Sequence, residues 1–426
     1  MMLGDLYFFI KGYIRAKISL HLSGAAIAIL QKKKFTSLSH RMLKRSPFYA
    51  KYVGSDLKSY PIINKKIHMD NFNSINTKGL NGNKALDIAI ESEHSRDFSP
   101  EYGKYAVGLS SGTSGSRGLF VLSSAERAKW AGYIIGKMLP ISLKSQKVAF
   151  FLRANNNLYE TANGKLLTFK FFDLLNGIES NIELLNDFSP NILIAPASVL
   201  RRIAESAIEI NPERVISVAE VLENDDKEII ERKFNVRIEQ IYQCTEGFLA
   251  ATCKDGALHL NEDAYIIEKK WIDKKSGRFS PIVTDLNRST QPVIRYLLDD
   301  ILILNPVPCS CGSSMTRIDS IEGRCDDVLS LERCDQSIVD VFPDFIRNTI
   351  VSSSKNLEQF RVVQKSKHRI EIAILPFDRE IVKSIKKSLE TLWKKLSVLP
   401  PDCCYIEFSH EELDKKQRRV VSEYNG

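Results

Sequence analysis

The sequence lacks the features that would place the protein across a membrane or outside the cell. Its apolar start, Leu3 to Ile10, is soon followed by Arg15, Lys17 and His21, so it is too interrupted to cross a bilayer. No basic leader precedes it and no small-residue cleavage site follows. We therefore expect a cytoplasmic protein with reduced cysteines and no transmembrane segment. An N-terminal helix lying on a membrane is the alternative to one packed on the protein's own core, and we prefer the core.

The chain also lacks internal repeats, low-complexity tracts and interleaved basic and aromatic residues, and the last absence argues against a nucleic-acid-binding protein. The net charge of +8, from 60 Lys and Arg against 52 Asp and Glu, is mild for 426 residues. It suits anionic substrates such as nucleotides. The chain is too long for one compact domain, so we expect a large domain and a smaller one.

Hydrophobic patterning predicts an α/β fold for the large domain. Residues 5–45 have apolar residues at helical spacing, whereas 55–100 are polar and irregular. Beyond these, short apolar runs alternate with helix-like segments such as Ser198–Ile210 and Asp225–Phe234, which favours mostly parallel sheets. The expected strands are Tyr105–Leu109, Leu119–Leu122, Lys147–Leu152, Ile192–Ala195, Val215–Val218 and Arg237–Tyr242.

A different pattern begins after Arg324 and predicts a small C-terminal α+β domain. We place the boundary between residues 1–323, with a helical N-terminal segment of about 50 residues, and residues 324–426. The elements expected in the small domain are a helix at Val339–Ile350, strands at Glu358–Gln364 and Arg369–Leu375, a helix at Asp378–Leu396 and a strand at Cys404–Phe408.

A run rich in glycine, serine and threonine lies between the first two expected strands. It reads Ser110, Ser111, Gly112, Thr113, Ser114, Gly115, Ser116, Arg117 and Gly118. The glycines let backbone N–H groups approach a polyanion, and the hydroxyls and the arginine add donors and charge. This chemistry suits the β- and γ-phosphates of ATP, although the run is not a Walker A loop. A flexible turn is the alternative interpretation.

Four residues form a candidate metal set. Cys253 and His259 are followed, about fifty residues later, by Cys309 and Cys311. One imidazole and three thiolates make a tetrahedral zinc set without an open position, so the metal would be structural. Gly256 and Gly312 could form the tight turns that such ligands need. Buried cysteines beside a surface histidine are the alternative.

Ser110–Gly115, followed by Trp130, resembles the phosphate loop of the adenylate-forming enzyme superfamily. Within it, the chain looks most like the phenylacetate–CoA ligase branch, which includes synthetases that adenylylate a deazaflavin cofactor and capsule-locus homologues. The resemblance is weak before Arg45–Tyr49 and continuous from about residue 100 to 422. It implies a nucleotide- and acyl-substrate-binding large domain and a mobile C-terminal lid. Some members of the branch carry a similar Cys/His cluster.

The resemblance also implies roles for residues in the large domain. Val218-Ala219-Glu220 matches the adenine-contacting segment, so Ala219 and Glu220 are expected to bind the nucleotide. Tyr242 to Gly247 resembles the Tyr-x-x-Thr-Glu motif, in which Tyr242 would stack on adenine, Thr245 would touch the α-phosphate and Glu246 would hold Mg²⁺. Without these neighbours, Thr245-Glu246 would indicate a threonine-capped helix start.

Further matches lie near the domain boundary and the C-terminus. Asp300 would bind the ribose hydroxyls, Arg324 would approach a phosphate, and Asp326 would be the hinge pivot. Lys416 matches the catalytic lysine that stabilises the α-phosphate, although Lys415 is an alternative because no glycine precedes the pair. Two other departures are Ser116-Arg117-Gly118 in place of Lys-Pro-Lys and Leu298-Asp299 in place of Thr-Gly.

Together these features predict an ATP-dependent, AMP-forming ligase that uses ATP and Mg²⁺. A small-molecule carboxylic acid would be activated as acyl-AMP with release of pyrophosphate. The acyl group would then pass to a thiol, of coenzyme A or a carrier protein, or to an amine. One alternative is a nucleotidyl transferase that places AMP on a cofactor hydroxyl. Another is a degenerate protein that binds nucleotide without catalysis.

Overall fold

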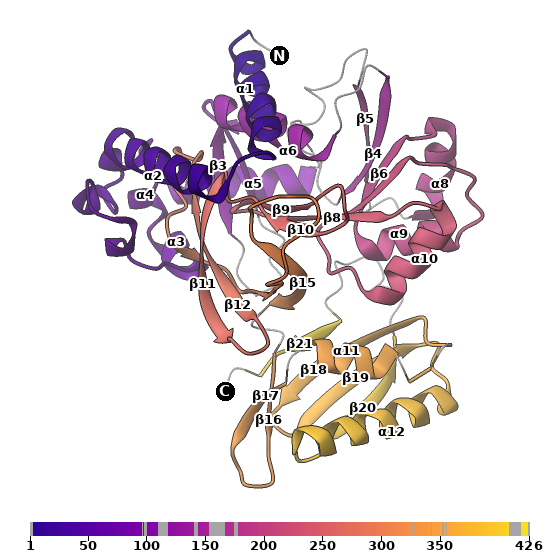
Figure 1. Ribbon diagram of the computed structural model, residues 1–426. Helices are drawn as coiled ribbons and strands as arrows, with labels where there is room; N and C mark the ends of the chain where they lie inside the picture. The colour runs from indigo at the N-terminus through magenta and orange to yellow at the C-terminus, as the bar shows by residue number, and fades with distance from the viewer. Residues whose placement is uncertain are drawn as a thin grey trace. The chain divides into compact units, whose positions relative to one another are not determined.

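The chain folds into two compact units, shown in the computed structural model of Figure 1. The first comprises Met1–Leu298 and Leu302–Ser320, and the second Asp299–Ile301 and Ile321–Gly426. The structure describes residues 3–95, 97, 100–109, 118–139, 144–152, 167–173, 178–324, 328–341, 343–351, 353–354, 356–408 and 419–424. No helix in these ranges is long and apolar enough to span a membrane.

One half of the largest sheet is parallel, which confirms the α/β class. Across the described residues this sheet has 12 strands, in the order β11-β12-β14-β15-β10-β9-β8-β7-β6-β4-β5, with β13 paired to β12. The parallel strands are β4 (Gln146–Leu152), β5 (Leu167–Asp173), β6 (Ile192–Ala195), β7 (Arg214–Ser217) and β8 (Ile238–Cys244). They alternate in sequence with α8 (Ile178–Phe188), α9 (Ala197–Glu205) and α10 (Asn224–Phe234).

Helices α8, α9 and α10 form because each buries an apolar stripe against the parallel strands. Leu200 and Ile203 of α9 and Ile230 of α10 are fully buried, in a core that also holds the stacked rings of Phe151 and Phe172. Such burial stabilises the fold by roughly 25 cal/mol for each Å² of apolar surface removed from water. The parallel half is therefore a rigid support for whatever follows the ends of its strands.

The other half of the sheet is antiparallel, so the expectation of mostly parallel sheets holds for only part of the unit. A separate antiparallel sheet contains β1 (Glu101–Tyr102), β2 (Tyr105–Leu109) and β3 (Leu119–Ser123). The remaining strands of the large sheet are β9 (Gly247–Thr252), β10 (Leu258–Leu260), β11 (Tyr265–Asp273), β12 (Arg278–Asp285), β13 (Tyr296–Leu297), β14 (Asp300–Leu304) and β15 (Arg317–Arg324).

The prediction that residues 55–100 are irregular is wrong. They contain short helices whose ends are capped by asparagine: the Asn64 side chain accepts from the Ile67 N–H, and the Asn76 side chain donates to the Phe72 carbonyl. The helices of 3, 6 and 4 residues are too short to show a period in the sequence, whereas the fourth, of 14 residues, is long enough and was missed. The elements are η3 (Leu57–Ser59), α3 (Lys65–Asp70), α4 (Phe72–Ile75) and α5 (Gly82–Ser95), after η1 (Leu43–Arg45) and η2 (Ala50–Tyr52).

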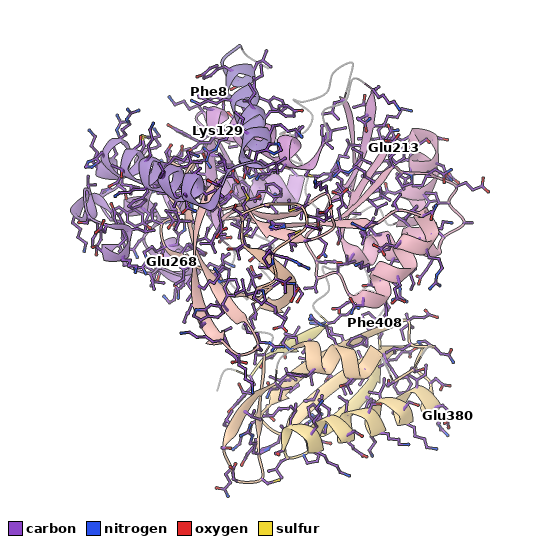
Figure 2. All side chains as sticks on the ribbon, in the orientation of Figure 1. Phe8, Lys129, Glu213, Glu268, Glu380 and Phe408 are labelled. Atoms are coloured by element: carbon purple, nitrogen blue, oxygen red, sulfur yellow. The ribbon has the colours of Figure 1, made fainter. Side chains whose placement is uncertain are left out.

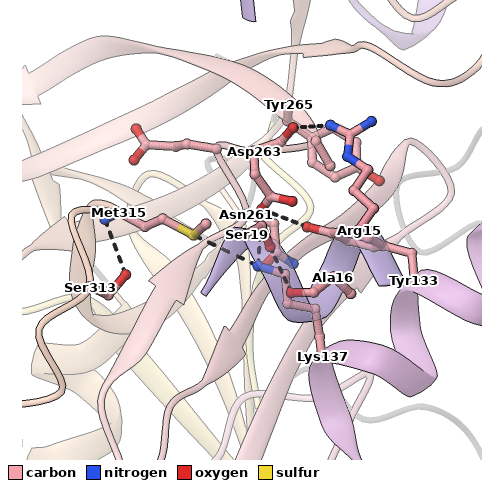
Figure 3. A network of polar contacts seen from close by, with 12 residues as sticks. Arg15, Ala16, Ser19, Tyr133, Lys137, Asn261, Asp263, Tyr265, Ser313 and Met315 are labelled. Carbon is pink, nitrogen blue, oxygen red and sulfur yellow. Dashed lines mark hydrogen bonds and ion pairs between the residues drawn. The ribbon is translucent and has the colours of Figure 1, made fainter. Parts of the chain in front are cut away.

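The N-terminal segment is helical as predicted, in two helices, α1 (Leu3–Ser19) and α2 (Gly24–Arg41). Helix α1 packs along α6 (Ser124–Met138), as the preferred interpretation expected. Arg15 of α1 donates to the backbone carbonyl of Asp263, while Tyr133 and Lys137 of α6 bond the same residue's carboxylate at 2.7 and 3.0 Å (Figure 3). Asp263 is fully buried, and it links Arg15 of α1 to the two donors of α6.

The backbones of α1 and α6 approach so closely that only glycine fits between them. A Cβ atom added to Gly132 would lie 2.0 Å from the Phe9 carbonyl oxygen. We therefore expect Gly132→Ala to destabilise the protein by about 2 kcal/mol or more, despite alanine's better helix propensity. Chemical denaturation followed by circular dichroism measures this. Gly4→Ala, on the partner helix α1 with no atom within 4 Å of its Cβ, should be neutral or slightly stabilising. Equal stability of the two variants would contradict the prediction.

The second unit is an α+β sandwich. Its four-stranded sheet has the order β20-β19-β18-β21 and is covered by α12, whose buried Trp393 and Ile385 pack in the core. One prediction is corrected: Val339 to Val341 belong to a strand, because they pair with Leu329–Leu331 in a hairpin, and the helix begins only at Pro343. The elements are β16 (Leu329–Glu332), β17 (Ile338–Val341), α11 (Pro343–Val351), β18 (Gln359–Ser366), β19 (Arg369–Leu375), α12 (Arg379–Leu396), β20 (Asp402–Glu407) and β21 (Val420–Ser422).

Candidate functional site

Two of the predicted nucleotide-binding segments follow adjacent parallel strands. Strands β7 and β8 pair in parallel, with Ser217 opposite Gln240. Ala219 and Glu220 come just after the end of β7, and Thr245-Glu246 just after the end of β8. In open α/β sheets, ligands bind outside the carboxyl ends of the strands. Both segments therefore lie along the edge where such a ligand would be expected.

Thr245 and Glu246 form the two-residue connection of a β-hairpin. Cys244 at the end of β8 pairs with Gly247 at the start of β9. The interpretation of Thr245-Glu246 as a helix start is therefore wrong, since a strand follows. Gly247 is required by close packing, because a Cβ there would lie 2.5 Å from the Tyr265 ring. The Tyr265 hydroxyl also accepts a hydrogen bond from the Phe248 N–H at 3.0 Å, which holds the connection in place.

A pocket in the first unit brings this connection next to the end of the predicted phosphate loop. Gly118 is the last residue of that loop, and residues 110–117, with Ser110–Gly115 among them, lie outside the described residues. Leu109 and Leu119 are cross-strand neighbours, so the two ends of the loop are held together. The pocket is lined by Lys65, His68, Met69, Gly118, Leu119, Phe120, Thr245, Glu246, Arg288, Gln291, Val293 and Tyr296.

The described strands on either side of the loop do not match the surroundings of a serine-hydrolase nucleophile. Gly108, Ser110 and Gly112 fit the spacing of a Gly-x-Ser-x-Gly nucleophile elbow. That elbow joins a strand to a helix, whereas here β2 is followed by its antiparallel partner β3.

Two buried side chains that the sequence analysis missed connect the Thr245 turn to β3. The guanidinium of Arg288 donates to the Thr245 carbonyl at 2.8 Å and to the Gln291 side-chain oxygen at 2.6 Å. Gln291 in turn accepts from the Val121 N–H and donates to the Leu119 carbonyl, each at 2.8 Å. A continuous set of hydrogen bonds thus sets the spacing between Glu246 and the strand after the phosphate loop.

Glu126, at the start of α6, is a third missed residue. Its carboxylate forms a capping box with Ser123 and also accepts from the backbone N–H groups of Ser289 and Thr290. Burial would raise the pKa of Glu126, but the hydrogen bonds from Thr290, Ser123 and Ser289 outweigh it and the pKa lies below its ordinary value. The Ser123-x-x-Glu126 spacing is a signal that could have identified this residue.

His68 lines the same pocket with an unpaired ring nitrogen. Burial, and secondly the charge of Arg288, lower the pKa of His68 to about 4, so its imidazole is neutral near pH 7. One ring nitrogen donates to the Pro292 carbonyl. Nε2 has no hydrogen-bond partner among the described residues and is therefore an acceptor beside Thr245 and Glu246.

The segment after β7 presents backbone rather than a free carboxylate. Ala219 is exposed and has a φ of 65°, a conformation that costs a non-glycine residue energy and often marks a functional site. The Glu220 carboxylate accepts a hydrogen bond from the Ser198 N–H at 3.0 Å, at the start of α9. Tyr242, the predicted adenine-stacking residue, lies in β8 and is 7% exposed.

The other predicted nucleotide and catalytic residues are placed only in part. Asp300 is the first residue of β14 and is half-buried, and its contacts group it with the second unit. Arg324 ends β15, and its side chain is not among those described. Asp326, Lys415 and Lys416 lie outside the described residues.

The four predicted metal ligands come together in one cluster. The ligand atoms of Cys253, His259, Cys309 and Cys311 all lie within 4.8 Å of one another. Cys253 and Cys309 Sγ are 3.8 Å apart, and Cys311 Sγ is 3.5 Å from His259 Nε2. Tetrahedral zinc, with its usual bond lengths, separates two sulfurs by about 3.8 Å and a sulfur from a nitrogen by about 3.6 Å. The cluster therefore fits zinc.

The surroundings of the cluster also suit metal binding. His259 Nδ1 donates to the Met315 carbonyl at 2.9 Å, which leaves Nε2 free to coordinate. A backbone hydrogen bond from Cys311 lowers the pKa of the Cys309 thiol, whereas burial raises the pKa of the Cys311 thiol, so Cys309 is the thiol of this pair that favours the thiolate form. Gly256 and Gly312 adopt φ of 85° and 79° in the turns beside the ligands, as the sequence predicted.

Known proteins resemble this chain in sequence over somewhat less than half of its length. No protein-family model matches the chain. A phenylacetate-coenzyme A ligase of Thermus thermophilus is 24% identical over 229 residues, covering 48% of this chain and 50% of that protein. Protein CapK of Staphylococcus aureus is 28% identical over 202 residues, covering 45% of this chain and 42% of that protein. The chain thus spans about half the length of the curated relatives it matches.

Solved structures share the fold over more of the chain. A 2-hydroxyisobutyryl-CoA ligase in its postadenylation state, with 2-HIB-AMP, has a TM-score of 0.64 at 16% identity and covers 94% of this chain and 90% of that one. The amide bond synthetase McbA of Marinactinospora thermotolerans has a TM-score of 0.52 at 11% identity, covering 75% of this chain and 68% of that one. The chain therefore has the fold of the adenylate-forming ligases, and in sequence it resembles the phenylacetate–CoA ligases among them.

Proposed function

We propose that this protein is an AMP-forming ligase that activates a carboxylic acid with ATP. The observation that carries the proposal is the pocket that places the Thr245-Glu246 turn beside Gly118, at the end of the Gly/Ser-rich loop. A nucleotide triphosphate held there would have loop N–H groups and hydroxyls at its phosphates. Glu246 would hold Mg²⁺, which neutralises phosphate charge, and Thr245 would contact the α-phosphate.

The first step joins a carboxylate oxygen of the acid to the α-phosphorus of ATP and releases pyrophosphate. Arg288 and Gln291 hold the Thr245-Glu246 turn at a fixed distance from β3, so the turn is positioned before substrate arrives. Ala219, Glu220 and Tyr242 would hold the adenine. Asp300 would bind the ribose, and Arg324 and Lys416 would approach the phosphates.

In the second step an acceptor takes the acyl group and AMP leaves. The solved relatives named above are a CoA ligase and an amide bond synthetase, which supports a thiol, of coenzyme A or a carrier protein, or an amine as acceptor. We propose that residues 324–426 act as a mobile lid that rotates about Asp326 between the steps. We propose a cytoplasmic location, which the use of ATP and of reduced cysteine thiols would suit.

We further propose that Cys253, His259, Cys309 and Cys311 bind a structural zinc ion. All four positions would be filled by protein ligands, so no position is left for substrate. The metal would join the β9–β10 turn to the segment before β15, on the antiparallel half of the large sheet.

Exchange of radiolabelled pyrophosphate into ATP, over a panel of aryl, fatty and amino acids, tests the first step. We expect exchange that depends on one class of acid and that falls by about 100-fold or more in either Lys416→Ala or Lys415→Ala, whichever removes the catalytic lysine. Protein that binds ATP but gives no exchange with any acid would contradict the ligase. AMP found on a cofactor hydroxyl would instead support the nucleotidyl transferase, and inert nucleotide binding the degenerate protein.

A further inference from the structure

The positive charge of the chain is concentrated in its first 50 residues. They contain nine lysines and arginines and one acidic residue, Asp5. Removing these from the chain's 60 basic and 52 acidic residues leaves 51 of each, so residues 51–426 carry no net charge. The carboxylate of Asp5 accepts a hydrogen bond from the Ser124 hydroxyl of α6. The exposed charges of α1 and α2 are therefore basic: Lys11, Lys32, Lys33 and Arg41.

The same segment exposes a row of large apolar side chains. On α1 the row recurs at three- and four-residue spacing and so occupies one face of the helix. Tyr7 and Ile18 are each 59% exposed, and Ile29 on α2 is 70% exposed. An exposed apolar helix face of this kind marks an interaction site. The members of the row are Leu6, Tyr7, Ile10, Ile14 and Ile18, followed by Leu20 and by Ile29 of α2.

Helix α1 cannot turn this face inward, because its opposite face is fixed to the rest of the unit. Gly12 of α1 meets the backbone of Lys129 so closely that a Cβ would lie 2.1 Å from its carbonyl oxygen. Arg15 and Lys17 donate to the carbonyls of Asp263 and Leu139. Figure 2 labels Phe8 on α1 and Lys129 on α6, the helix against which α1 packs.

We propose that the outer face of α1, with the exposed basic residues of α1 and α2, binds the surface of an anionic lipid bilayer. The apolar row would enter the boundary between headgroups and acyl chains, as interfacial helices do. Lysine and arginine would be drawn to the negative headgroups. Because one face of α1 is committed to α6, the helix would lie along the surface.

The charge of the segment favours this occupant over two others. A symmetric contact with a second copy would place the same basic segment against itself, and like charges repel. A nucleic acid would neutralise the charge but would leave the apolar row facing phosphates and water. An anionic bilayer complements both the charge and the apolar side chains.

Co-sedimentation with vesicles tests the proposal on the full-length protein. Wild type should bind vesicles that contain phosphatidylglycerol, should not bind pure phosphatidylcholine vesicles, and should dissociate as salt rises. Ile10→Ser/Ile14→Ser/Ile18→Ser should weaken binding by about 100-fold. Lys32→Gln/Lys33→Gln should weaken it by about 30-fold, if each lysine contributes the energy typical at an anionic surface.

Matched variants elsewhere on the surface serve as controls. Val307→Ser/Ile338→Ser removes apolar side chains that are 60% and 53% exposed, and Lys394→Gln/Lys395→Gln removes two exposed charges from α12. Both should bind vesicles like wild type. Absence of wild-type binding, or equal losses in the controls, would overturn the proposal. The proposal would also be overturned if wild type did not bind vesicles but formed a dimer in light scattering, and if the triple isoleucine variant disrupted that dimer.

Discussion

Replacing Glu246 with glutamine should lower acid-dependent ATP–pyrophosphate exchange by about 100-fold or more, with little change in stability. The substitution keeps the size of the side chain and removes the charge that would hold Mg²⁺ against the phosphates. Glu246 is half-buried in a hairpin connection whose position is set by Arg288 and Tyr265, so the fold does not depend on its carboxylate. Exchange rates over a range of Mg²⁺ concentrations measure the effect, and the variant should need more Mg²⁺.

Glu239→Gln is the matched control for this variant. Glu239 lies on the same strand, β8, near its amino end, and its carboxylate is paired with Arg214. Loss of a partly exposed ion pair typically costs 1 kcal/mol or less, so exchange should be close to wild type. Equal activity in the Glu246 and Glu239 variants would show that Glu246 does not hold Mg²⁺. The ligase proposal would then be tested by the lysine variants alone.

Replacing Cys309 and Cys311 together with serine should abolish bound zinc and lower the unfolding midpoint by roughly 5 to 10 °C. The four ligands come from two segments about fifty residues apart, and the metal would cross-link these segments. Strand pairing joins them only weakly, because β10 pairs with β15 through two residues, Leu258 and His259. Elemental analysis measures the metal, and thermal unfolding with and without a chelator measures its contribution to stability.

The double variant Cys334→Ser/Cys404→Ser controls for the loss of two thiols. Cys334 is exposed and Cys404 half-buried, and neither is in the cluster. This control should keep its zinc and its midpoint, and the chelator should lower the midpoint of wild type and control but not of the cluster variant. A wild type that contains no zinc, or a cluster variant as stable as the control, would refute a structural metal.

The sequence could predict the parts of the site whose signals are local. Strands β7 and β8 were recognisable from their apolar runs, and once they are parallel neighbours the segments that follow them share one edge. The metal ligands were recognisable by residue type. The close-packed geometry of the cluster was not, because it depends on the register that sets His259 opposite both Ala251 and Arg317.

The remainder depended on contacts that no local pattern encodes. Thr245-Glu246 was open to a helix-start interpretation because Tyr265, which holds the hairpin connection, lies some twenty residues further along the chain. The partnership of Gln291 with β3 spans about 170 residues. Val339 to Val341 directly precede a helical segment and fall within the predicted helix, but their pairing with β16 makes them a strand.

The close fit between α1 and the rest of the first unit has a consequence for the order of events during synthesis. Helix α1 is made before its partners: Ser124 lies 119 residues after Asp5, and Asp263 lies 248 residues after Arg15. At about 5 to 20 residues per second, the ribosome needs on the order of 10 to 50 seconds to supply Asp263. Helices form within about a microsecond, so the wait for native partners is about ten million times longer than the folding of α1 itself. The inner face of the helix lacks its full set of native contacts throughout that interval, so the growing chain exposes apolar surface that the finished protein buries.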